Sequence, residues 1–214
     1  MKKSFAKGNN FYKLFWIFFI GCFLGVAIET IWCLIKLGHI ESRQGLVYGP
    51  FNLVYGFGAI AMTLVFSRMR KTNIFIIFIL GALLGGVYEY VCSMVQQALT
   101  GTVSWDYGEY AVNLNGRISL LYCIFWGILA VLWCKVLYPF ISTLIEKIPN
   151  KIGIILTWVL LVFMIFNSVI STMAVYRMQN RSKNIPPSNK IEQLLDERFN
   201  DERMKRIYPN MMIK

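Results

Sequence analysis

The sequence predicts an all-α, polytopic integral membrane protein with about five transmembrane helices, a parallel internal repeat and a polar helical tail. The composition supports this class, because 57% of the 214 residues are hydrophobic and only 15% are charged. The pattern supports it too, since the chain contains several apolar runs of about 20 residues, the length that crosses a bilayer. A third observation is a glycine and glutamate spacing that occurs twice.

The apolar runs define the expected spans in order along the chain. They cover residues 14–37, 51–66, 74–98, 118–138 and 152–176. The first run is too long for a signal-peptide core, and no small-residue cleavage site closes it, so we expect it to be retained. The second run is short and carries Gly56 and Gly58, which favours close packing or a partly re-entrant path.

The spans divide the chain into four parts. We expect a basic cytoplasmic N-terminus at 1–13, a membrane domain of four spans and two outward loops at 14–140, an interfacial segment with the fifth span at 141–176, and a charged tail at 177–214. The interfacial segment follows Pro139 and alternates apolar with polar residues. Within the tail, the sequence IEQLLDERFNDERMKRI predicts a charged amphipathic helix.

Lysine and arginine are distributed unequally between the two expected sides of the membrane. One side collects the basic residues Lys2, Lys3, Lys7, Lys13, Arg68, Arg70, Lys71, Lys147 and Lys151. The other side has only Lys36, Arg43 and Arg117 before the tail. The positive-inside rule therefore predicts a cytoplasmic N-terminus with both motif loops facing outward. Arg177 and Arg181 disagree with this, because five spans place the tail outside.

The first and third spans carry the same spacing of small and acidic residues. Gly21, Gly25 and Glu29 in the first span correspond to Gly81, Gly85 and Glu89 in the third. Four-residue spacing places all three residues on one helical face, and small residues on that face let helices approach closely. The two spans point the same way, so the sequence predicts a parallel repeat, one of the ways in which transporters are built.

The repeated glutamates are the strongest functional candidates. A carboxylate in hydrocarbon costs several kcal/mol unless it is paired or reaches water. Glu29 is followed by a loop with Arg43, and Glu89 by a loop with Arg117. We expect these four side chains to converge on one pocket open to the outer leaflet, where arginine's planar fork suits a phosphate or carboxylate group. The alternative is a structural ion-pair network that only holds the helices together.

The two loops supply further candidates for a substrate pathway. Tyr48 and Tyr107 could line a pocket or belong to the aromatic belt of a membrane interface, as could Trp105 and Tyr110. Asp106 has no such explanation.

The second loop ends in polar residues of alternating position. Asn113, Asn115 and Arg117 would form one polar edge if this segment is extended, because alternate residues then face the same way. In the first loop, Gly49 and Pro50 indicate a turn into the second span, and Asn52 is expected to cap or pack there.

Several functional classes are disfavoured. The net charge of +11 lies beside apolar runs, which favours anionic lipid head groups over nucleic acid. The five cysteines lie in apolar segments without paired spacing, which argues against a disulfide framework or a zinc site. His39, the single histidine, has no partner of metal-binding spacing, so we expect no metal and no cofactor. The 214 residues contain no phosphate-binding loop for ATP hydrolysis.

Ordered motifs connect the chain to a known family. They are RQGLVYGPFNLVYG (43–56), GGVYEY (85–90), WDY (105–107) and NLNGRI (113–118). Together they resemble a bacterial family of ABC transporter permeases, also called ABC-transporter type IV or CmpB-like, over about residues 12–140. The resemblance implies a polytopic plasma-membrane protein that serves as a transport permease, with a separate ATP-binding subunit as its partner. It supplies no substrate and no catalytic residue.

Three hypotheses follow. The first is a permease or small transporter subunit whose polar pathway is lined by Glu29, Arg43, Glu89, Asp106 and Arg117. The second is a membrane-embedded enzyme on a lipid or lipid-linked substrate, with Glu89 or Asp106 as base and Arg117 holding a head-group phosphate. The third is a non-catalytic membrane scaffold. Membrane lipids are expected partners in each case, and assembly with further copies of the chain stays open.

Overall fold

The computed structural model describes residues 4–213 and is 69% helical. Lys2 and Lys3, which contribute to the predicted orientation, lie outside the described residues. The helices are α1 Phe11–Leu37, α2 Leu53–Phe66, α3 Ile74–Thr100, α4 Leu120–Leu132, the π-helix η1 Trp133–Leu137, α5 Tyr138–Glu146, α6 Asn150–Ser182, α7 Lys190–Arg198 and α8 Asp201–Ile207. The strands are β1 Thr102–Val103, β2 Asn113–Leu114, β3 Ile118–Ser119 and β4 Met212–Ile213.

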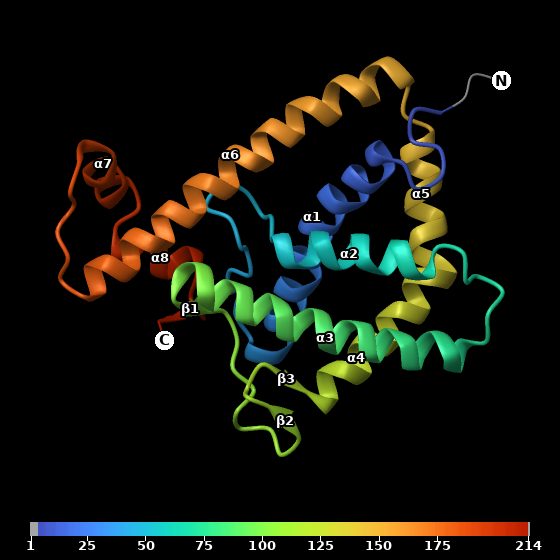
Figure 1. The fold of residues 1–214 in the computed structure, drawn as a ribbon, viewed down its shortest axis with the longest axis horizontal. Helices are drawn as coiled ribbons and strands as arrows, with labels where there is room; N and C mark the ends of the chain where they lie inside the picture. The colour runs from blue at the N-terminus through green and yellow to red at the C-terminus, as the bar shows by residue number, and fades with distance from the viewer. Residues whose placement is uncertain (1–3, 214) are drawn as a thin grey trace.

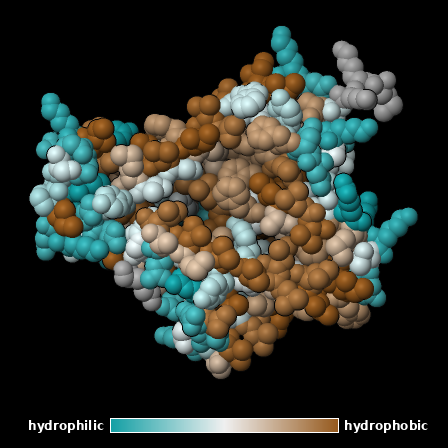
Figure 2. All heavy atoms as spheres, in the orientation of Figure 1, coloured by the Kyte–Doolittle hydropathy of each residue, from teal (hydrophilic) through white to brown (hydrophobic). Residues whose placement is uncertain are grey.

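The predicted all-α membrane class is confirmed, but the count of five spans is not. In the described part of the chain, four helical stretches are long and apolar enough to cross a membrane: α1, α3, the continuous run Leu120–Glu146, and α6. With 14 residues, α2 is shorter than the roughly 20 that a full crossing needs. Figure 2 shows an apolar surface over the helices, with hydrophilic patches at the tail and near the N-terminus, as expected for helices surrounded by lipid.

The helix expected to end at Tyr138 continues to Glu146. Pro139 lacks a backbone N–H and would break a regular helix interior. Here it follows the π-helical turn η1 and lies at the start of α5. The wider turn changes the hydrogen-bond register just before the proline, so the helix passes through it.

The segment between α1 and α2 enters the bundle. Gly38 ends α1 with a φ of 75°, a conformation that glycine adopts without strain. The chain then returns until the backbone N–H of Asn52 donates to the carbonyl of Cys22, near the middle of α1, at 3.1 Å. Asn52 caps α2 as predicted, since its side chain accepts from the N–H of Val54. Residues 39–52, which we call the re-entrant segment, therefore return between the helices to the level of Cys22, and α2 begins there.

Polar side chains of α6 hold this re-entrant segment. Asn167 is fully buried; it accepts from the N–H of Tyr48 at 3.2 Å and donates to the carbonyl of Tyr48 at 2.7 Å. Ser171 accepts from the N–H of Val47 at 2.9 Å. Non-helical backbone inside a membrane domain must have its hydrogen bonds supplied by protein. These two residues of α6 supply them.

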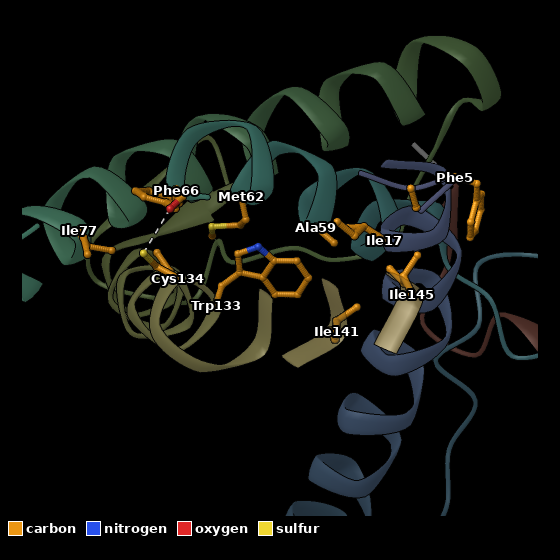
Figure 3. Packing of buried hydrophobic residues seen from close by; sticks show 12 residues of the cluster. Phe5, Ile17, Ala59, Met62, Phe66, Ile77, Trp133, Cys134, Ile141 and Ile145 are labelled. Carbon is orange, nitrogen blue, oxygen red and sulfur yellow. Dashed lines mark hydrogen bonds between the residues drawn. The ribbon is translucent and has the colours of Figure 1, made fainter. Parts of the chain in front are cut away.

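The largest of three buried apolar clusters lies at the end of the bundle near the N-terminus. Figure 3 shows Ile17, Met62, Phe66, Trp133 and other apolar side chains packed between α1, α2, α5 and η1. The Trp133 indole N–H donates to the Thr63 hydroxyl at 3.2 Å, so this buried aromatic ring has a partner for its polar atom. The cluster joins the two hairpins α1–α2 and α3–α4, which also meet where the Tyr88 hydroxyl of α3 donates to the carbonyl of Val54 in α2 at 2.6 Å.

The tail folds back onto the opposite end of the bundle, where α7 and α8 lie beside the last turns of α6 (Figure 1). The single predicted helix over 191–207 is broken at Phe199, and Asn200 caps the second piece through the N–H of Arg203. Strand β4 pairs antiparallel with β1, which follows α3. The tail therefore lies on the same side as the loop after α3.

The positive charges after the fifth span are part of this tail packing. Arg177 is 1% exposed and binds Asp196 at 2.6 Å and Glu192 at 3.3 Å. Arg181 pairs with Asp196 and Asp201. These arginines are held in ion pairs with the tail, which explains why they occur at the end opposite the other basic clusters.

Candidate functional site

The two helix hairpins present their glutamates through equivalent contacts. Tyr55 of α2 donates its hydroxyl hydrogen to the carboxylate of Glu29 on α1. The indole N–H of Trp126 on α4 donates to the carboxylate of Glu89 on α3 at 3.1 Å. In each hairpin the second helix thus supplies an aromatic donor to the glutamate of the first. The structural correspondence agrees with the predicted parallel repeat.

The repeated glycines make these contacts possible. A Cβ atom on Gly25 would overlap the Tyr55 ring, and one on Gly85 would overlap the Trp126 ring. Each glycine lies one helical turn before its glutamate, so the aromatic ring crosses the glycine and reaches the carboxylate. The G-x3-G-x3-E pattern therefore encodes a glutamate bound by an aromatic donor from the neighbouring helix.

Glu89 has a second aromatic partner from the loop after α3. The Tyr107 hydroxyl donates to Glu89 at 2.6 Å. Burial raises the pKa of Tyr107, and the nearby Glu89 raises it further, so the phenol stays protonated and remains a donor. Tyr107 also stacks on Tyr122 with ring centroids 4.3 Å apart. Glu89, 7% exposed, is therefore fixed by neutral donors.

Both glutamates line one cavity of about 600 Å³, which we call the inter-hairpin cavity. Its walls come from α1, α2, α3, α4 and α6, the re-entrant segment, the loop after α3, and residues 208–211 of the tail. Figure 2 shows the surface hollowed between α6 and the layer formed by α2 and α3. The cavity is where the two repeat units, the re-entrant segment and the tail meet.

Arg43 of the re-entrant segment also lines the cavity. Its guanidinium lies 3.8 Å from a Glu29 oxygen and donates to Glu41 at 3.2 Å. Its Nε atom is buried without a hydrogen-bond partner in the described residues. Of the nine predicted site residues, the cavity therefore contains Glu29, Arg43, Glu89 and Tyr107.

Arg117 is not among the described residues that line the inter-hairpin cavity. Its guanidinium donates to the Ser93 hydroxyl at 2.9 Å and to the side chain of Gln97, and it lies over the Tyr90 ring. The two repeat units differ here, because Arg43 reaches its glutamate and Arg117 binds the last turns of α3 instead.

The other predicted residues form loop structure. The side chain of Asp106 accepts from the N–H of Gly108, that of Asn113 accepts from the N–H of Gly116, and that of Asn115 donates to the Tyr90 hydroxyl. Tyr48 is held through its backbone by α6. None of these four residues is among the described residues that line the cavity.

The predicted polar edge of Asn113, Asn115 and Arg117 is wrong. Asn115 and Gly116 have positive φ values of 54° and 67°, so the chain reverses there, and β2 pairs with β3 as a hairpin. Asn-Gly is a strong hairpin turn signal, and it overrides the alternation assumed for an extended segment. The three side chains consequently point to different partners.

Sequence reasoning missed the aromatic donors Tyr55 and Trp126. The signal was present, because each is followed directly by a glycine, Gly56 or Gly127, in the second span of its repeat unit. Extending the repeat from the first helix of each unit to the second would have found the pair. The contribution of residues 208–211 has no such signal, since it depends on how the tail folds back.

The described residues contain no cluster of three or more His, Cys, Asp or Glu side chains placed to hold a metal ion.

The fold defines a multi-pass helical membrane protein built on two repeated helix hairpins. A family model described as "Putative ABC-transporter type IV" matches residues 16–172, nearly three quarters of the sequence. The chain belongs to this family, which confirms the resemblance found in its motifs. It is thus a membrane component of transporter type, and its family implies association with other transporter subunits. No curated protein and no solved structure matches the chain.

Proposed function

We propose that the chain is the permease subunit of a transporter and that its substrate passes through the inter-hairpin cavity. The observation that carries the proposal is the placement of Glu29 and Glu89, one from each repeat unit, on the walls of the same cavity. Ionisable residues inside membrane segments are costly and mark substrate pathways when they face a cavity. Sites near the junction of repeated units are usual in transporters.

The proposed orientation has the N-terminus in the cytoplasm of a plasma-membrane protein and the cavity opening toward the outer leaflet. Exposed basic residues gather at the N-terminal end of the bundle, namely Arg68, Arg70, Lys71, Lys147 and Lys151. At the other end, Arg43, Arg177 and Arg181 are held by carboxylates, and Arg117 is held by neutral side chains. Among the connectors between the helices, exposed positive charge is concentrated at the N-terminal end, which supports this orientation, whereas the tail carries its own exposed bases, such as Lys183 and Lys190, beside five carboxylates.

Energy for transport would come from a separate ATP-binding subunit, because the 214 residues contain no phosphate-binding loop. At the N-terminal end of the bundle, two segments could contact this subunit: the connector between α2 and α3, and the end of α5. At the end of α5, Glu146 binds the buried amine of Lys13 at 2.6 Å, so this end is fixed to α1. Movement of a docked partner at Lys147 would be transmitted directly to α1.

Isolation of the tagged full chain from its membrane, followed by mass spectrometry, tests for the partner. We expect an ATP-binding subunit in stoichiometric amount. Lys147→Glu should reduce its recovery, whereas Lys190→Glu, equally exposed at the other end, should not. A chain that purifies without any ATP-binding subunit would contradict the energy source proposed here.

A transport phenotype tests the pathway. Replacing Glu29 and Glu89 together by glutamine keeps the side-chain size and removes both charges, and each glutamine keeps one acceptor oxygen while the other is replaced by an NH2 donor. We expect loss of the transport phenotype in a strain that carries only this variant. Glu109→Gln, an exposed glutamate in the loop after α3, is the matched control. Full transport by the double variant would refute the pathway.

The lipid-enzyme hypothesis gains no support from the geometry. It needs a carboxylate and Arg117 around one substrate. The Arg117 guanidinium is directed to Ser93 and Gln97, and the Asp106 carboxylate to the backbone of Gly108. The scaffold hypothesis is the reading that survives if the double glutamine variant retains full function.

A further inference from the structure

An apolar groove adjoins the inter-hairpin cavity. It measures about 580 Å³ and lies between α1, α2 and α6, with Phe15, Phe18, Ile60 and Met164 among its walls. Leu53, Phe57 and Ser168 line both spaces, so the groove and the cavity adjoin at these three residues. A polar space thus lies directly beside an apolar one.

We propose that these two spaces bind one amphiphile, with an amine or quaternary ammonium head group in the cavity beside Glu89 and an alkyl chain in the groove. The proposal deepens the proposed function, on which it rests, by naming the substrate class of the same site. It depends on three independent features: the charge of the cavity, its aromatic walls and the position of the groove.

The charge of the cavity favours a cation. Its ionisable acidic and basic lining residues are two carboxylates, Glu29 and Glu89, and one guanidinium, Arg43, which gives a net charge of −1 when all are ionised. Arg43 is already paired with Glu29 and Glu41. Glu89 forms no ion pair among the described residues. A ligand cation would add an opposite charge to the two neutral hydrogen-bond donors, Tyr107 and Trp126, that Glu89 already has.

The walls around Glu89 are aromatic. Tyr107 and Tyr122 stack on each other, and Tyr88 meets Trp126 edge to face with centroids 5.9 Å apart. All four rings line the cavity. Aromatic faces beside a carboxylate recognise ammonium groups through cation–π attraction, and such cages are selective for quaternary amines.

The groove determines what the rest of the ligand is. Its walls belong to helices surrounded by hydrocarbon, and Ser168 is the polar residue among its lining side chains. An alkyl chain fills such a space without loss of hydrogen bonds, whereas a polar group would lose them. Because the groove adjoins the cavity at Leu53, Phe57 and Ser168, one molecule can place its head group in the cavity and its alkyl chain in the groove.

One feature of the cavity favours an anionic ligand instead, and the experiment below tests it directly. The buried Nε atom of Arg43 has no partner, so an anionic head group would find a donor there. Dodecyl phosphate is therefore the competing probe for dodecyltrimethylammonium, because the two share a chain and differ in the sign of the head group.

Equilibrium dialysis of the full chain in a nonionic detergent measures binding of isotope-labelled dodecyltrimethylammonium. We expect one saturable site that dodecyl phosphate does not compete for. Glu89→Gln should weaken binding about tenfold, Glu89→Asp should weaken it less, and Glu109→Gln should leave it unchanged. Ile60→Trp, which fills the groove, should weaken binding of this probe and leave tetramethylammonium binding unchanged.

Each contrary result overturns the inference. If dodecyl phosphate binds as tightly as the ammonium probe, the site accepts an anionic head group at Arg43 and is not selective for cations. Unchanged affinity in a folded Glu89→Gln variant would show that the charge of Glu89 does not bind the head group. Equal affinity for butyl- and dodecyltrimethylammonium would show that the alkyl chain does not bind in the groove.

The outcome is separable from that of the transport test. If the double glutamine variant loses transport while dodecyl phosphate is the preferred probe, the pathway stands and the cationic ligand is wrong. If the ammonium probe binds as expected while the double variant transports fully, the site stands and the proposed function is wrong.

Discussion

Replacement of Asn167 by leucine is predicted to release the re-entrant segment. The buried amide of Asn167 makes two hydrogen bonds to the backbone of Tyr48, one at the N–H and one at the carbonyl. Leucine has similar volume and makes neither bond. Each buried backbone group left without a partner costs about 1–3 kcal/mol. Inter-helix hydrogen bonds in membrane proteins lie toward the low end of such values, so we expect a total loss of about 2–4 kcal/mol.

The free energy of unfolding can be measured by titration with SDS in mixed micelles, using intrinsic tryptophan fluorescence. Thr172→Val is the matched control on the same helix, because the exposed Thr172 hydroxyl donates to the carbonyl of Ser168 one turn earlier and has no other hydrogen bond within residues 4–213. We expect the control to stay within about 0.5 kcal/mol of the unmodified chain. Equal unfolding energies for the two variants would refute the argument that α6 holds the re-entrant segment.

The same helix packing, capping and ion pairing yield three further predictions. Gly85→Ala places a methyl group against the Trp126 ring and should lower the unfolding free energy by about 1–3 kcal/mol; Gly58→Ala, where a Cβ meets only ordinary contacts, is its control. Asn52→Ala removes the cap of α2 and should cost about 0.5–2 kcal/mol in the same titration, and no loss would show that the cap is dispensable. Hydrogen bonds from Arg177 hold the pKa of Asp196 below its usual range. Because the folded-state pKa is lowered, this contribution is complete above the unfolded value of about 3.9 and disappears as the pH falls through the lower folded value. Protease release of the tail should therefore rise at acidic pH in the unmodified chain, and in Asp196→Asn it should be high already at neutral pH. A tail that stays resistant in the variant would show that the ion pair between Arg177 and Asp196 does not hold the tail.

Helix positions and the repeat could be predicted because they depend on local pattern. Hydropathy located α1, α3 and α6 within a few residues, apart from a longer C-terminal end of α6. The Gly-x3-Gly-x3-Glu spacing identified the face on which each hairpin packs, because i and i+4 positions coincide on a helix whatever its surroundings.

The loop residues were harder to predict, since their role depends on the path of the backbone. The Arg117 and Arg43 loops look equivalent in sequence, but the Asn-Gly turn at 115–116 reverses one of them and directs Arg117 to α3. Asp106 accepts a hydrogen bond from the N–H of Gly108, two residues later, as in an Asx turn. A residue type indicates what a side chain can bind, and the turn determines which partner lies within reach.

Hydropathy and periodicity in the sequence were sufficient for the membrane class, the helices and the repeated glutamates, because these follow from interactions between near neighbours and from the solvent. The cavity follows from long-range contacts that no local pattern contains. Asn167 lies 119 positions from Tyr48 in the chain, and the Tyr208 hydroxyl reaches the carbonyl of Gly45 across 163 positions. Such contacts exist only after the chain has folded, and they bring the re-entrant segment and the tail to the glutamates.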